Sequence, residues 1–161
     1  MKKMLAMLLA LVMVLSLAAC ASTQPAAEPA ASSDAPAESG KTYTVGVCQL
    51  VQHEALDAAT QGFVDALKEA LGDAVTIDVQ NASGDSVNCG TIVNGFVSKG
   101  VDLIMANATP ALTAAVSATA DIPILGTSIT AYGVALDIDD FNGTVGGNVS
   151  GTSDLADLQK Q

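Results

Sequence analysis

The stretch Val-Asp-Leu-Ile-Met-Ala-Asn-Ala-Thr-Pro-Ala-Leu-Thr-Ala-Ala-Val-Ser-Ala-Thr-Ala, residues 101–120, decides the fold. Its residues 103–106 are a short, nearly continuous apolar run, which predicts a buried strand. A polar corner follows, with Thr109 at the expected N-cap and Pro110 at the first helical position. Four residues then repeat at helical spacing: Leu112, Ala115, Val116 and Thr119. The stretch therefore predicts a strand that leads into a helix, which is half of a βαβ unit.

The corner between this strand and this helix is a candidate ligand site. In open α/β sheets, ligands bind at the carboxyl ends of the strands. The unpaired N–H groups and the positive dipole end of a helix favour an anion such as a carboxylate. We therefore expect Asn107, Ala108 and Thr109 to face a ligand. The alternative is an ordinary loop between strand and helix that contacts nothing.

Strand-like and helix-like segments alternate along the chain. We expect strands at residues 43–50, 75–79, 103–106 and 122–126, and helices at 54–71, after the N-cap Asp85, and after Thr109. Gly72 and Gly100 are the expected ends of the first two helices. This alternation predicts an α/β fold, a three-layer parallel sheet with helices on both faces. Residues 131–140 are expected to form an irregular fifth strand and a loop, and residues 148–151 a short strand.

The N-terminus has the pattern of an export signal. Lys2 and Lys3 precede an apolar run, residues 4–17, that is too short for a membrane-spanning helix. The run ends in Leu17-Ala18-Ala19-Cys20, which resembles the lipobox of bacterial lipoproteins. That resemblance implies a signal peptide at residues 1–19 and lipidation of Cys20, and the alternative is a plain signal peptide with an incidental cysteine. Residues 20–40, rich in Ala, Ser, Pro and Glu, are expected to be a disordered linker.

Composition argues against several classes of function. Without residues 1–19, four lysines stand against seventeen carboxylates, a net charge of about −13, so nucleic-acid binding is not expected. His53, the only histidine, has no further metal ligand near it in sequence, so we expect no metal site and place His53 on the surface or at a cleft rim. No nucleophile motif or dinucleotide-binding glycine motif is present, so neither an enzyme nor a cofactor is expected. Cys48 and Cys89 are compatible with a disulfide and with two buried free thiols.

Five stretches resemble, in the same order, the ABC-transporter substrate-binding lipoproteins that are described as tryptophan- or tyrosine-binding. Residues 45–57 with Gly62-Phe63 resemble the opening of that family. Residues 81–85, 107–110 and 126–128 resemble its next three corners, and residues 146–154 resemble its crossing segment between two lobes. The resemblance implies one lobe of a type I periplasmic-binding-protein fold. It places an N-terminal lobe at residues 41–145 and the crossover, with the start of a second lobe, at residues 146–161.

The resemblance also implies a function, a set of contacts and partners. The chain would be a lipid-anchored extracytoplasmic component of an ABC importer that binds a small solute, first of all an aromatic amino acid, and delivers it to a permease. The expected ligand contacts are Gln49, His53, Asn107, Ala108, Thr109, Thr127, Ser128, Thr130, Ser153 and Asp154. Helix N-capping explains Asp154 equally well, and Ala131 stands where many members have an acidic residue. The alternatives are a single-lobe lipoprotein sensor or scaffold that docks another membrane protein, and a flavodoxin-like redox module.

Overall fold

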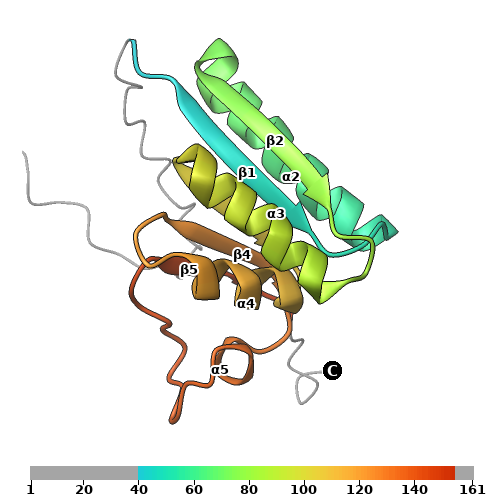
Figure 1. The fold of residues 1–161 in the computed structure, drawn as a ribbon, viewed down its shortest axis with the longest axis vertical. Helices are drawn as coiled ribbons and strands as arrows, with labels where there is room; N and C mark the ends of the chain where they lie inside the picture. The colour runs from blue at the N-terminus through green and yellow to red at the C-terminus, as the bar shows by residue number, and fades with distance from the viewer. Residues whose placement is uncertain (1–39, 155–161) are drawn as a thin grey trace, which may run out of the picture. The chain divides into compact units, whose positions relative to one another are not determined.

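The structure, a computed structural model, describes residues 40–154. The expected signal peptide, Cys20 and residues 21–39 of the expected linker lie outside the described residues, as do residues 155–161. The elements of the described part follow one another in the order β1 (Tyr43–Gln49), α2 (Glu54–Leu71), η1 (Gly72–Ala74), β2 (Val75–Asn81), α3 (Ser86–Lys99), β3 (Leu103–Asn107), α4 (Thr109–Ala118), β4 (Ile124–Ile129), α5 (Tyr132–Ala135) and β5 (Val149–Ser153) (Figure 1).

All five of these strands join one parallel sheet in the order β2-β1-β3-β4-β5. Helix α2 lies on one face of this sheet, and α3 and α4 lie side by side on the other (Figure 1). The expected three-layer α/β architecture is therefore confirmed. Between residues 40 and 154, no helix is both long enough and apolar enough to cross a membrane.

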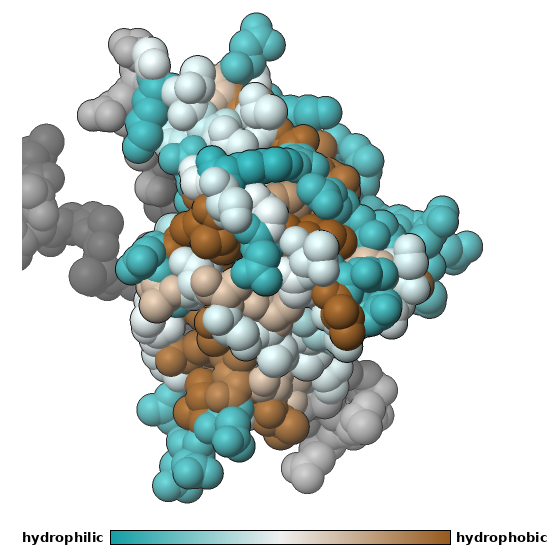
Figure 2. Space-filling view, in the orientation of Figure 1, coloured by the Kyte–Doolittle hydropathy of each residue, from teal (hydrophilic) through white to brown (hydrophobic). Residues whose placement is uncertain are grey.

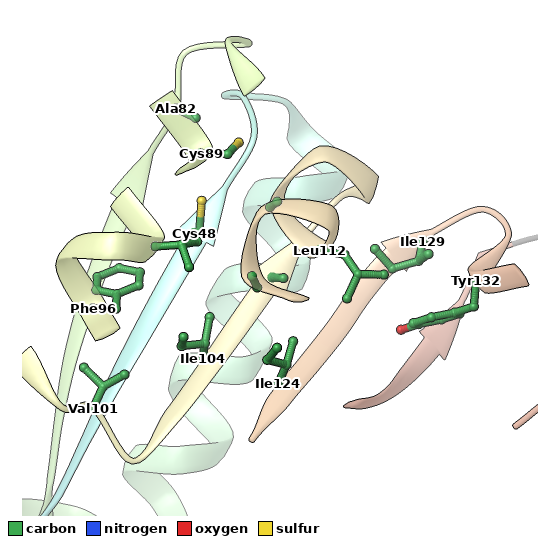
Figure 3. Packing of buried hydrophobic residues seen from close by; sticks show 14 residues of the cluster. Cys48, Ala82, Cys89, Phe96, Val101, Ile104, Leu112, Ile124, Ile129 and Tyr132 are labelled. Carbon is green, nitrogen blue, oxygen red and sulfur yellow. The ribbon is translucent and has the colours of Figure 1, made fainter. Parts of the chain in front are cut away.

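Alternation along the strands divides the core between the two faces. Cys48, Ile104 and Ile124 point to the side of α3 and α4, where they join Phe96 and Leu112 in one buried cluster (Figure 3). The neighbouring residues of β1 and β3 point the opposite way, toward α2, because successive side chains of a strand face opposite sides. Both faces of the central strands are apolar, as expected for strands buried inside a parallel sheet.

The helix ends follow local signals that are visible in the sequence. The Asp85 carboxylate accepts a hydrogen bond of 2.8 Å from the Val87 N–H, so this residue caps α3 as predicted. Gly100 ends α3 in the left-handed region, at φ 66°, and Gly72 ends α2. The expected N-cap of α4 was wrong by one residue, because Ala108 takes that position and Thr109 is already helical.

Two expectations about the second half of the sheet were wrong. β4 begins at Ile124 and continues through Ile129, whereas the sequence predicted a strand over residues 122–126. Its pairing with β5, which includes Ile124↔Val149 and Ile129↔Ser153 across an irregularity, extends the strand. Residues 131–140 form no strand. They contain α5 instead, where Tyr132 turns back and its hydroxyl donates to the Gly126 carbonyl oxygen at 3.0 Å.

Gly46 provides a test of how closely α3 packs on β1. A Cβ atom added there would lie 2.5 Å from Phe96 Cγ, in the middle of the core. We expect Gly46→Ala to lower the free energy of unfolding by about 1–3 kcal/mol, because the ring must move out of a packed site. Chemical denaturation measures this loss.

Gly62→Ala is the matched control. Gly62 lies in α2 with nothing within 4 Å of the added Cβ, so the same change should stabilise the chain by about 0.5–1 kcal/mol. Equal effects of the two substitutions would contradict the close packing of α3 on β1.

Candidate functional site

Three of the predicted site residues lie in one row across neighbouring strands. Gln49 pairs with Asn107, and Asn107 pairs with Thr127, so the row crosses the carboxyl ends of β1, β3 and β4. Side chains of paired residues in parallel strands point to the same face of the sheet. The side chains of this row point to the face that α2 covers. The sequence therefore predicted the juxtaposition of these three residues, and their contact with a ligand stays a prediction.

The first two residues of the row are held in a buried polar network. The exposed fraction of Gln49 is 4% and that of Asn107 is 0%. Thr60 of α2 lies between them: its hydroxyl donates to Gln49 Oε1 at 2.7 Å and accepts from Asn107 Nδ2 at 2.9 Å. Asn107 Nδ2 also donates to the Leu56 carbonyl oxygen at 2.8 Å, and Gln49 Nε2 donates to the Asp57 carboxylate. The two amides thus fasten the strand ends to α2.

Asn107 Oδ1 is a buried acceptor without a hydrogen-bond partner among residues 40–154. The amide orientation is fixed by its other end, because Nδ2 already donates to two oxygen atoms. A buried polar atom that lacks a partner is costly. The row therefore contains a buried hydrogen-bond acceptor that the described part of the chain leaves without a donor.

Thr127, the third member of the row, is half-buried and lines a pocket of about 180 Å³ with Ala59, Phe63 and Leu125. The pocket exists because α2 is narrower than the sheet that it covers. One helix is about 10 Å wide and neighbouring strands are about 4.8 Å apart, so α2 covers the middle of the sheet and leaves β4 partly open.

Strained backbone gathers at the same edge of the sheet. Three of the five non-glycine residues with positive φ in the described part are Ser83, Ala108 and Ser128, at φ 56°, 91° and 57°. They lie in the corner after β2, in the corner after β3 and near the end of β4. Ala108, with ψ 155°, occupies a region that is populated almost only by glycine. Such strain tends to gather at functional sites, where the surrounding structure enforces it.

The helix N-termini at this edge differ in how they are capped. His53 Nδ1 accepts from the Ala55 N–H at 3.2 Å and caps α2, which gives the exposed His53 a structural role. Asp85 caps α3, whereas α4 has no side-chain cap hydrogen bond. Thr109, its first residue, is half-buried and lines a groove of about 470 Å³ between α3 and α4. The N–H groups at the start of α4 remain suited to an anion.

A larger pocket of about 500 Å³ lies where β4 and β5 end. Thr130 and Ser153 line it, and the Ser153 hydroxyl donates to the Thr130 carbonyl oxygen at 3.0 Å. Its other walls are mostly apolar and include Tyr132 and Phe141. The Tyr132 phenol, protonated at neutral pH as phenols ordinarily are, donates its hydrogen bond to the Gly126 carbonyl oxygen, and burial raises its pKa further. Figure 2 shows hydrophobic atoms gathered at this end of the molecule.

The remaining predicted residue, Asp154, is exposed and follows β5 directly, where its N–H donates to the Ile129 carbonyl oxygen at 3.0 Å. The predicted residues thus occupy one edge of the sheet: the row under α2, the start of α4 and the pocket at the ends of β4 and β5. Ser128 in β4 and His53 at the start of α2 stand outside these three groups. No group of three or more metal-ligating side chains occurs within the part of the chain that the structure describes.

Sequence reasoning missed Thr60 and the aromatic walls of the large pocket. Thr60 could have been found, because it is a polar residue on the apolar stripe of α2, four positions after Leu56 and three before Phe63. Tyr132 lies in the segment 131–140, which was expected to be an irregular strand and a loop, and Phe141 directly follows that segment. No local pattern there indicates that the two rings line one pocket.

Thr60→Val tests the network. The substitution keeps the shape of the side chain and removes the hydroxyl that joins Gln49 Oε1 to Asn107 Nδ2. We expect a loss of about 2 kcal/mol in the free energy of unfolding, because one buried acceptor and one buried donor lose a partner. Thr91→Val is the control, since the exposed Thr91 hydroxyl donates only to the Val87 carbonyl oxygen of its own helix, and should change stability by less than about 0.5 kcal/mol. Similar losses would contradict the network.

Ala108→Gly tests the backbone strain. Glycine adopts the conformation of residue 108 without a steric penalty, so the variant should be about 1 kcal/mol more stable in spite of the greater freedom of its unfolded chain. Thermal denaturation shows directly whether the substitution raises or lowers the stability of the chain. A destabilised variant would show that Ala108 is not strained.

Comparison with known proteins places this geometry in a family. The sequence model described as ABC transporter substrate binding protein matches residues 44–161. A tyrosine-binding protein from Clostridioides difficile (strain R20291) is 41% identical over an alignment of 129 residues that covers 76% of this chain and 36% of that protein.

Solved structures agree with this match. A substrate-binding protein with adhesive properties from Clostridium difficile, in its ligand-free, open form, is 42% identical with a TM-score of 0.68 and covers 74% of this chain and 41% of its own. An ABC domain from Streptococcus pneumoniae in complex with L-Trp is 36% identical with a TM-score of 0.67, over 75% of this chain and 41% of its own. The chain thus spans well under half the length of these relatives. It belongs to the family of ABC transporter substrate-binding proteins.

Proposed function

We propose that the chain supplies one side of an amino-acid-binding cleft in the extracytoplasmic component of an ABC importer. Its ligand would be an amino acid, with an aromatic side chain first, and the component would deliver that ligand to a permease. Lipidation at Cys20 would hold the protein at the outer face of the cell membrane. In this proposal residues 1–19 are the signal peptide, 20–40 the linker, 41–145 the N-terminal lobe and 146–161 the crossover.

One observation carries the proposal. The strained Ala108 and the start of α4, which lacks a side-chain cap, lie at the carboxyl edge of the sheet in a chain of this family. A carboxylate is the group that every free amino acid presents, and backbone N–H groups at a helix start are suited to bind it. The relatives described as binding tyrosine and L-Trp, at 41% and 36% identity, support an aromatic side chain.

The experiment uses the absence of tryptophan from the chain. Added L-tryptophan is then the only indole in the sample, so the anisotropy of its fluorescence reports binding directly. The protein is produced as its gene encodes it, and any tryptophan in second-lobe sequence that the reading frame holds is replaced by phenylalanine, so that the ligand stays the only indole. We expect anisotropy to rise with protein concentration, and L-tyrosine to displace L-tryptophan while L-lysine does not. No rise with millimolar protein, and no thermal shift with a panel of amino acids, would refute the proposal.

A pair of variants tests the role of the α4 start. Thr109→Ala removes a hydroxyl at the first helical residue and should weaken L-tryptophan binding about tenfold, the equivalent of one lost hydrogen bond. Thr113→Ala removes an exposed hydroxyl one helical turn later, where it donates to the Thr109 carbonyl oxygen, and should change the affinity less than about twofold. Equal affinities of the two variants would place the carboxylate elsewhere.

A further inference from the structure

Two cysteines outside the candidate site meet inside the core. Cys48 lies in β1 and Cys89 in the first turn of α3, and the exposed fraction of each is 0%. Both belong to one buried hydrophobic cluster. Figure 3 shows the sulfur of Cys48 directed toward Cys89. Both residues are free thiols in this structure.

The packing of α3 on β1 explains why they meet. Phe96 lies against Gly46, which fixes one point of close approach between helix and strand. Cys48 is two residues further along β1 on the same face, about 7 Å away. Cys89 is two helical turns before Phe96, about 10 Å away. Because α3 leads into β3, which is parallel to β1, helix and strand run in opposite directions, and the two cysteines lie at the same level.

The surroundings give the two thiols different reactivity. Burial, and to a smaller extent the neighbouring Cys89, raise the pKa of Cys48 to about 12. Burial also raises the pKa of Cys89, while the neighbouring Cys48 thiol acts in the opposite direction and favours the thiolate. Cys89, in the first turn of α3, becomes the attacking thiol when that turn opens and exposes it to the oxidant.

We propose that Cys48 and Cys89 form an intramolecular disulfide when the chain meets an external disulfide as the oxidant. The Cys89 thiolate attacks one sulfur of the external S–S bond, which breaks and releases one thiolate. Cys48 then attacks Cys89 Sγ, breaks the mixed disulfide and releases the second thiolate. The two cysteines lose two electrons, the external disulfide gains them, and the two S–H protons end on the two released thiols.

The extracytoplasmic location of this family favours disulfide formation. Proteins of this family act outside the cytoplasm, where disulfides form and persist. The disulfide would join the carboxyl end of β1 to the start of α3. The chain between these two segments contains α2 and β2, so the disulfide would close a long loop in the unfolded chain. Cross-links that close long loops restrict the unfolded chain most.

To test this, the purified, folded chain is treated with oxidised glutathione. The remaining thiols are then blocked, and the protein is digested with trypsin. Cleavage at Lys41, Lys68 and Lys99 places Cys48 in peptide 42–68 and Cys89 in peptide 69–99. We expect one species with the combined mass of both peptides, which separates on reduction. The melting temperature should rise by about 10 °C and return on reduction.

Cys48→Ala and Cys89→Ala are the matched controls, and neither should give the linked species or a rise in melting temperature on oxidation. The proposal is overturned if the folded wild-type chain keeps both thiols free, ends as a stable glutathione adduct, or links either cysteine only to Cys20 or to a second chain. The wild-type result decides the question even if a variant does not fold.

Discussion

The carboxyl edge of this sheet depends on one hydrogen-bonded contact, the Thr60 hydroxyl between Gln49 and Asn107. The contact joins α2 to β1 and β3 at the level where both strands end. Inside a protein such hydrogen bonds are strong and directional, and a half-formed network costs more than none. The position of α2 along the sheet is therefore set by polar groups, while its apolar residues supply the burial. Sliding the helix by one residue would leave several buried amide atoms unpaired.

Backbone hydrogen bonds beside this contact hold the loops that follow the strands. The Asn107 carbonyl oxygen accepts from the Leu50 N–H at 3.1 Å, and the Ala108 N–H donates to the Thr127 carbonyl oxygen at 3.0 Å. Ala108 is thus held from both sides in a conformation that a free alanine avoids. Strain of this kind persists only where neighbouring structure over-determines it. The constrained end of β3 leads directly into the first residues of α4.

The sequence predicted what local signals control. The bounds of α2 and the caps at Asp85, Gly72 and Gly100 come from residues within one helical turn, so pattern and capping chemistry suffice. The extension of β4 through Ile129 depends on β5, which lies some twenty residues further on, and no pattern within β4 encodes it. The site shows the same division. The sequence predicted Gln49 and Asn107 for the same site, but the network that holds them depends on Thr60, a residue of another element whose partners only the fold reveals.

This burial decides what the edge offers to a ligand. The amides of Gln49 and Asn107 already bind the scaffold, so the groups left at the edge are mainly backbone N–H groups at the start of α4 and the half-buried hydroxyl-bearing residues Thr109 and Thr127. Such donors recognise a carboxylate, which all amino acids share, and do not distinguish one side chain from another. In the proposed function this lobe therefore anchors the common part of the ligand. Selectivity for an aromatic ring requires apolar walls, and the larger pocket beside Tyr132 and Phe141 is where the described residues provide them.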